Sequence, residues 1–327
     1  MDYKYLYDLN DHASSWRDPY TEKREDGSDK FTVARIIEPE GPRFLYWVLD
    51  DYANAGPKDT DCSVAQFPHW HIAGYETFFV DSGSLWLYIN GQKAFAQKGD
   101  IIQIQPGQNH GMAWLEDTKW RGTYSDMLVE PEGKQISNVI AHMPELANDP
   151  DVQALKKKGL DHIDCEPFLC KEVPTEQCLA IKNPSRPWAS YEFDKLTVKI
   201  VVERWENGGR RELPCFSMKP GFTAQWEKLP RYRDLLYVRK GKVKFNVMNE
   251  EFIAYDECIV DIPRFAPHSI EALEESDVYD LAGLPRWSMF LQNYASIKYY
   301  DPARLEKPET LAALKEQFDI PILSINF

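Results

Sequence analysis

The stretch "HWHIAGYETFFVDSG" (residues 69–83) sets two histidines one residue apart and places a glutamate five residues after the second. Side chains alternate between the two faces of a β-strand, so His69 and His71 point the same way. Glu76 is out of phase with them on a straight strand, but "AGY" (73–75) supplies a bend that returns its carboxylate to the same side. The stretch therefore predicts a metal site on strands, against the alternative of two ordinary strand histidines beside an unrelated glutamate.

A third histidine completes the predicted ligand set. His110 follows the turn sequence "IQPGQN" (104–109), which delivers it to the start of another strand. Imidazole and carboxylate are borderline ligands that suit Fe(II), Mn(II), Ni(II), Cu(II) or Zn(II). Three imidazoles and one carboxylate leave two positions of an octahedral metal for water, substrate or O₂. We therefore expect one divalent transition metal bound by His69, His71, Glu76 and His110.

The rest of the chain is dominated by strand signals. Short runs rich in β-branched and aromatic residues are separated by turn residues, which favours an all-β sandwich or barrel. The runs are "FLYWVLD" (44–50), "LWLYING" (85–91), "DIIQIQPG" (100–107), "LTVKIVVERW" (196–205), "LLYVRKGKVKFNV" (235–247) and "ECIVDIP" (257–263). Helix signals occur at 149–159 and 307–321.

The sequence repeats itself at an offset of 158 positions. Gly83 returns as Gly241 and His110 as His268, and "ETFFVDSG" is echoed by "DLLYVRKG". The other three ligand positions change in the second copy, where they become Glu227, Leu229 and Asp234. We expect a duplicated fold in which the second copy holds no transition metal and its carboxylates pair with Arg231, Arg233 or Arg239.

These residues resemble the two motifs of the cupin superfamily, G-x5-H-x-H-x(3,4)-E-x6-G and G-x5-P-x-G-x2-H-x3-N. The four ligand positions and both spacings are kept, while Ser63, Gln105 and Trp114 replace a glycine, the proline and the final asparagine. The resemblance covers about fifty residues of each half. It implies an all-β bicupin, two antiparallel barrels of the jelly-roll or double-stranded β-helix type with a few short helices. It also implies a metal site in the N-terminal barrel only.

On this basis the chain divides into five segments. They are an N-terminal arm (1–40), a metal-binding barrel (41–130), a connecting segment with a helix (131–190), a degenerate barrel (191–300) and a C-terminal helix and tail (301–327).

Four residues are expected to contact substrate. Phe78 is in phase with Glu76, and Met112 and Trp114 are in phase with His110, so their side chains should line the cavity, while Gln105 could donate hydrogen bonds. An apolar, aromatic cavity with one metal favours a flat organic substrate over a free sugar.

The resemblance leaves three functions open. The first is a dioxygenase-type oxidoreductase acting on a small aromatic or carboxylate/enol substrate, with iron as the expected metal and zinc, nickel, manganese or copper as alternatives. The second is a redox-neutral isomerase, epimerase, decarboxylase or lyase in which the metal acts as a Lewis acid. The third is a non-catalytic protein that binds a small ligand.

Charge and composition limit the partners. A formal net charge of −14 argues against a nucleic-acid groove or an anionic membrane face. The sequence has neither a run of 18 apolar residues nor a secretory signal, and its six cysteines form no C-x-x-C pair. We therefore expect a cytoplasmic protein with reduced thiols that binds a small molecule and does not enter membranes. Exposed sheet edges favour a homodimer.

Overall fold

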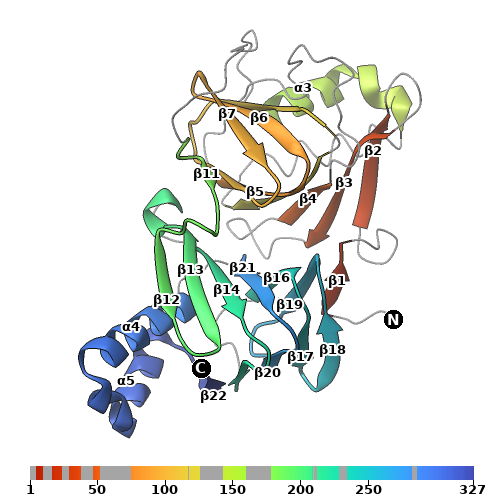
Figure 1. Cartoon of the computed structure of the whole chain (residues 1–327). Coiled ribbons are helices and arrows are strands. Elements are labelled where there is room, and N and C mark those ends of the chain that lie inside the picture. The colour runs from red at the N-terminus through yellow and green to blue at the C-terminus, as the bar shows by residue number, and fades with distance from the viewer. Residues whose placement is uncertain are drawn as a thin grey trace. The chain divides into compact units, whose positions relative to one another are not determined.

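In the computed structural model the chain forms two compact units (Figure 1). The first barrel comprises Trp16–Asn183, and the second barrel comprises Met1–Ser15 together with Pro184–Phe327. The structure describes residues 5–9, 17–23, 29–37, 47–51, 75–116, 118–125, 143–159, 178–207, 209, 212–227, 234–281 and 286–327. None of the helices in these ranges is long and apolar enough to cross a membrane.

Antiparallel sheets build the first barrel. One sheet has the order β10-β5-β8-β11, with β5 Tyr75–Ser82, β8 Ile101–Ile104, β10 Lys119–Ser125 and β11 Ile181–Lys182. Another has the order β7-β6-β9, with β6 Ser84–Ile89, β7 Gln92–Gln97 and β9 His110–Trp114. A third contains β2 Arg17–Lys23, β3 Asp29–Ile37 and β4 Trp47–Asp51.

The first two of these sheets share one apolar core, to which alternate residues of each strand contribute. The short helices η1 (Pro144–Asn148) and α3 (Pro150–Gly159) also belong to this unit. Asp149 caps α3, because its carboxylate accepts the backbone N–H groups of Asp151 and Val152 at 2.9 and 3.1 Å. The helix predicted at 149–159 is confirmed.

Two larger sheets build the second barrel. One has the order β1-β19-β16-β21-β14-β13-β12, with β1 Leu6–Asp8, β12 Ala189–Glu192, β13 Leu196–Val202, β14 Leu213–Met218, β16 Asp234–Lys240, β19 Cys258–Ile262 and β21 Ser276–Asp280. The other has the order β18-β17-β20-β15-β22, with β15 Thr223–Trp226, β17 Val243–Val247, β18 Glu250–Ala254, β20 His268–Ala272 and β22 Ile322–Asn326.

Four helices accompany the strands of the second barrel in the described residues, one between β13 and β14 and three between β21 and β22. They are η2 Arg204–Asn207, α4 Arg286–Tyr300, η3 Pro302–Glu306 and α5 Pro308–Phe318. The helix predicted at 307–321 corresponds to α5. The fifteen-residue α4 was not predicted, and it lies within the segment expected to be barrel.

The structure also divides the chain differently from the five predicted segments. Leu6–Asp8, expected in an N-terminal arm, pairs with β19 of the second barrel. Ile181–Lys182, expected in the connection, pairs with β8 of the first barrel. Both are short strands whose place depends on a partner far along the chain, and neither carries a local signal.

The offset of 158 positions recurs in the strand register. Glu76 lies opposite Ile104 in the first barrel, and Asp234 lies opposite Ile262 in the second. The pair Leu87 and Met112 is likewise matched by Phe245 and Ile270. The predicted duplication is therefore present at the level of individual strand pairs.

Left-handed turn residues follow the same offset. Positive φ angles occur at Gly83, Asn90, Gly91, Gly99 and Gly107, and again at Gly241, Met248, Asn249, Glu257 and Phe265. Glycine adopts such angles without a steric penalty, whereas methionine, glutamate and phenylalanine do not. The second barrel has kept the turns while losing most of the glycines that suit them.

Candidate metal centre

Two of the four predicted metal ligands lie side by side in the first barrel. Glu76 is the second residue of β5 and His110 is the first residue of β9, so they come from different sheets. The His110 Nε2 atom lies 2.9 Å from the Glu76 Oε2 atom, and both side chains are almost fully buried. A bend after the paired histidines was expected to return Glu76 to the site, and its side chain does reach His110.

The turn before β9 fixes the orientation of the His110 ring. Its Nδ1 atom lies 2.8 Å from the backbone carbonyl of Gln108 and must donate, because a carbonyl oxygen can only accept. The Gln108 side chain accepts the backbone N–H of Gln105 at 2.8 Å and so holds the turn closed. This arrangement is the one that orients metal-bound histidines through their second nitrogen.

The donor set fits a divalent metal ion. With Nδ1 donating to the Gln108 carbonyl, His110 directs Nε2 at the Glu76 carboxylate oxygen, 2.9 Å away. A contact this short requires a proton or a cation between the two atoms, and either an imidazolium N–H or a metal ion can occupy that position. A nitrogen and a carboxylate oxygen directed at one point form a donor pair that suits the borderline transition metals.

The other two predicted ligands, His69 and His71, lie outside the described residues. Within the described ranges there is no group of three or more histidine, cysteine, aspartate or glutamate side chains that could hold a metal ion. The four-residue ligand set therefore stays a prediction, for which Glu76 and His110 supply the observed half.

The predicted substrate residues fall into different places. Phe78 lies two residues after Glu76 on β5, and Met112 lies two residues after His110 on β9. Both side chains are buried, and Phe78 packs against Trp120 with ring centroids 4.3 Å apart. They form the apolar floor of the site. Gln105 lies in the partly exposed turn that precedes His110. Trp114 lies on β9, and its side chain is outside the described part of the structure.

Polar residues next to the ligands along β5 and β8 point away from the site. Thr77 donates to the Gln103 side chain at 2.6 Å, and Thr77 is adjacent to the inward-facing Glu76. Side chains alternate along a strand, so Gln103 lies on the outer face. It is an unsuitable substrate contact even though its sequence position is only seven residues from His110.

Comparisons with known proteins bear on the fold of the chain. Residues 62–122 match the family model of the cupin domain. The oxalate decarboxylase of Lactobacillus farciminis, solved as a formate complex, is similar over 86% of this chain and 86% of that chain, with 16% identity and a TM-score of 0.51. A cupin 2 conserved barrel domain protein from Leptotrichia buccalis is similar over 85% of this chain and 95% of that chain, with 14% identity and a TM-score of 0.51. No curated protein sequence matches.

The chain has the two-barrel fold of a bicupin. The family model spans both predicted motifs of the first barrel, and the solved structures are similar across both barrels. Sequence identity this low establishes the fold and leaves the reaction to be inferred from the chain's own residues.

The second barrel keeps the histidine but covers it. His268 lies at the position of His110, and its Nδ1 donates to the backbone carbonyl of Ala266 at 3.1 Å. Trp226 stacks on the imidazole with ring centroids 4.6 Å apart and an angle of 11° between the planes. Burial lowers the pKa of His268 to about 4, so the imidazole is neutral at ordinary pH.

Asp234, which corresponds to Glu76, also has different surroundings. Burial raises the pKa of Asp234 to about 6, against the opposing effect of a hydrogen bond with the Asp280 side chain. Asp280 occupies the position of Gly122 in the first barrel. Of the arginine partners expected for Asp234, Arg239 lies over the Tyr279 ring, while Arg231 and Arg233 are outside the described residues, so that pairing stays a prediction. The second barrel therefore places a second carboxyl group, Asp280, beside the acid that corresponds to Glu76.

Proposed function

We propose that the bicupin is a metal-dependent enzyme whose metal is held in the first barrel by His69, His71, Glu76 and His110. The observation that carries this proposal is the contact between Glu76 and His110. A buried carboxylate faces Nε2 of a histidine whose other ring nitrogen donates to a backbone carbonyl. When bound, the metal would supply a Lewis acid and two open coordination positions.

We further propose a dioxygenase-type reaction on a small substrate with an apolar body and an enol or carboxylate head. The layer beneath the metal ligands is apolar, because Phe78, Ile102 and Met112 are all buried in the barrel core. Such a floor favours an apolar substrate body and excludes water from its vicinity. Gln105, in the partly exposed turn beside His110, would bind the polar head.

Decarboxylation without net oxidation is the second candidate. It is favoured by the likeness of this fold to oxalate decarboxylase, at 16% identity. The two candidates differ in what the protein must supply. A decarboxylase needs a proton donor beside the metal, whereas a dioxygenase needs the two open coordination positions and an orienting pocket.

One experiment tests the site and separates the reactions. The metal content of protein purified without added metal is measured first, followed by O₂ uptake and CO₂ release on a panel of small enols and carboxylates. Iron with O₂ uptake supports the dioxygenase, and manganese, zinc or nickel with CO₂ release and no O₂ uptake supports the decarboxylase. A protein that binds none of these metals, even when they are supplied, would contradict both.

A further inference from the structure

The first turn of α4 covers the counterpart of the metal site in the second barrel. Trp287 of α4 packs edge-on against Trp226, with ring centroids 5.1 Å apart, and Trp226 is the residue that stacks on His268. The same Trp287 stacks on Phe290, which is fully buried in the barrel core. The contacts that hold this turn in place therefore also shield His268 from water.

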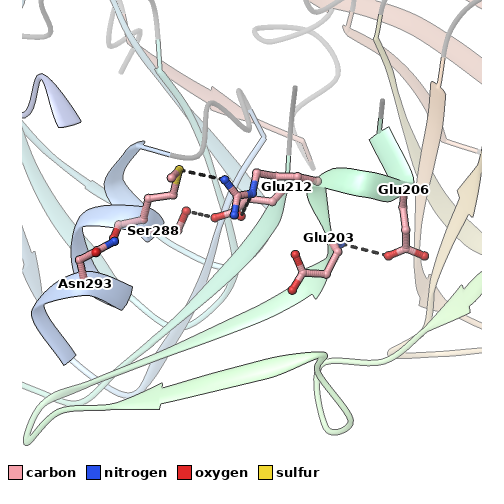
Figure 2. Close-up of polar contacts among 7 residues, drawn as sticks. Glu203, Glu206, Glu212, Ser288 and Asn293 are labelled. Carbon is pink, nitrogen blue, oxygen red and sulfur yellow. Dashed lines mark hydrogen bonds and ion pairs between the residues drawn. The ribbon is translucent and has the colours of Figure 1, made fainter. Parts of the chain in front are cut away.

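Polar contacts fasten this turn to the segment before β14 (Figure 2). The Ser288 hydroxyl donates to the Glu212 carboxyl, and both side chains are buried. Arg204 of η2 reaches the Met289 sulfur at 3.2 Å. At the other side of the helix Arg286 pairs with Asp319, after α5, at 2.8 Å. Among these contacts, the Glu212 carboxyl is the titratable group of the barrel that binds α4 directly, through Ser288.

The surroundings of Glu212 stabilise its carboxylate form only weakly. Its Oε2 atom is buried and receives no hydrogen bond from the described residues, since Arg204 Nε lies 3.5 Å away in a loose ion pair. Burial raises the pKa of Glu212 to about 7, an effect opposed by Arg204 and increased by Glu203. Tyr191 of β12 also faces this group, and its own pKa is raised by burial and then by the two carboxylates.

We propose that Glu212 is a proton-operated latch that holds the first turn of α4 over the second barrel. The neutral carboxyl stays buried against Ser288 and keeps the turn closed. The carboxylate needs water that the closed turn excludes, so ionisation favours states in which the turn has lifted. The rest of α4 stays attached through Phe290 and Leu291, which are fully buried. The latch therefore controls access to Trp226 and His268 without unfolding the barrel.

Hydrogen exchange of the full-length protein tests the latch. Amide protection in the peptide covering 286–300 is measured at about pH 6 and about pH 8, with rates corrected for intrinsic base catalysis. Because the closed group titrates near pH 7, whereas a solvent-exposed carboxyl is already ionised at about pH 6, protection should fall about tenfold as pH rises. The peptide covering α5 is the internal reference and should not change. Equal corrected protection of 286–300 at both pH values would overturn the proposal.

Variants separate the latch from general effects of pH. Glu212→Gln keeps the shape and cannot ionise, so protection should stay at the level seen at about pH 6. Glu206→Gln is the matched control, because Glu206 is equally buried but accepts from Trp188 and the Glu203 backbone instead of α4. It should retain the wild-type pH response. A tenfold response that persists in Glu212→Gln, or one that disappears in Glu206→Gln, contradicts the assignment.

A milder variant covers the case in which Glu212→Gln does not fold. Ser288→Ala removes the hydroxyl on α4 and leaves Glu212 in place. Protection of 286–300 should then drop several-fold at about pH 6 and approach the value at about pH 8. Unchanged protection in Ser288→Ala would show that this contact does not hold the turn.

Discussion

The two barrels share their strand register and turn positions but differ in what surrounds the histidine. In the first barrel His110 faces a carboxylate, whereas in the second His268 lies beneath a tryptophan ring. Both histidines donate Nδ1 to the carbonyl two residues earlier, at 2.8 and 3.1 Å. That hydrogen bond therefore belongs to the turn and does not depend on a carboxylate beside the histidine. The contact of Nε2 distinguishes a candidate ligand from a core histidine.

The largest difference between the barrels should be in metal binding. His110→Ala removes a proposed ligand, so bound metal should fall at least tenfold. His268→Ala, at the matching position, should leave the metal content unchanged, because Trp226 stacks on that imidazole. Elemental analysis of both purified variants checks this. Equal losses from the two variants would show that the second barrel also binds metal.

The next largest effect is expected from a substitution at Gly241, a buried glycine of the second barrel. A Cβ at Gly241 would lie 2.3 Å from Ser276 Oγ and 2.5 Å from the Glu275 carbonyl, at a φ of +97°. Gly241→Ala should therefore cost about 2–4 kcal/mol, from the clash together with the left-handed backbone. Gly91→Ala is the control, since nothing lies within 4 Å of its Cβ, and it should cost about 1 kcal/mol. Chemical denaturation measures both, and similar costs would contradict the role assigned to the clash.

The covered histidine predicts a loss of stability in acid. His268 has a folded pKa of about 4, below its ordinary 6.5, so the unfolded chain takes up a proton first as pH falls through this range. Stability should decline across that window by at most about 3 kcal/mol from this group. His268→Gln keeps a donor for the Ala266 carbonyl and removes the titration.

Denaturation at about pH 7 and about pH 4.5 tests this prediction. Asp234 and Glu212 have raised pKa values and act in the opposite sense, since they stabilise the fold at low pH and lose that effect as pH rises. Both remain in the variant, so the difference between wild type and His268→Gln isolates the histidine. An identical acid loss in the two proteins would contradict its burial as a neutral base.

The smallest expected effect comes from restoring a glycine to the second barrel. Phe265 has a φ of +61° at the position of Gly107, and its side chain is 62% exposed. Phe265→Gly removes the left-handed penalty and should stabilise the protein by about 0.5–1 kcal/mol. Phe265→Ala retains a Cβ and should give no gain. A gain from alanine that equals the gain from glycine would trace the effect to the exposed ring instead.

Parts of this fold could be predicted from the sequence because their signals are local or repeated. The motif spacings located Glu76 and His110, and the offset of 158 positions located both copies. The stacking of Trp226 on His268 could not be predicted from the ligand positions, because Trp226 lies one residue before the first of them, Glu227. The pairing of β1 could not be predicted, since "LYD" has no pattern of its own and its partner is remote.

That remote pairing imposes an order on folding. Leu6–Asp8 pairs with Cys258–Val260, and the hydrogen bonds from Leu9 N–H to Glu257 and from Asp261 N–H to Tyr5, both with backbone carbonyls, extend it. About 250 residues of chain separate the partners, which at ribosomal rates is roughly 10–50 s of synthesis. During that interval Leu6–Asp8 has no β19 to pair with, and it must avoid pairing with the exposed edge of another sheet. The largest sheet of the second barrel therefore takes an edge strand from a segment that is synthesised long before the other strands of that sheet.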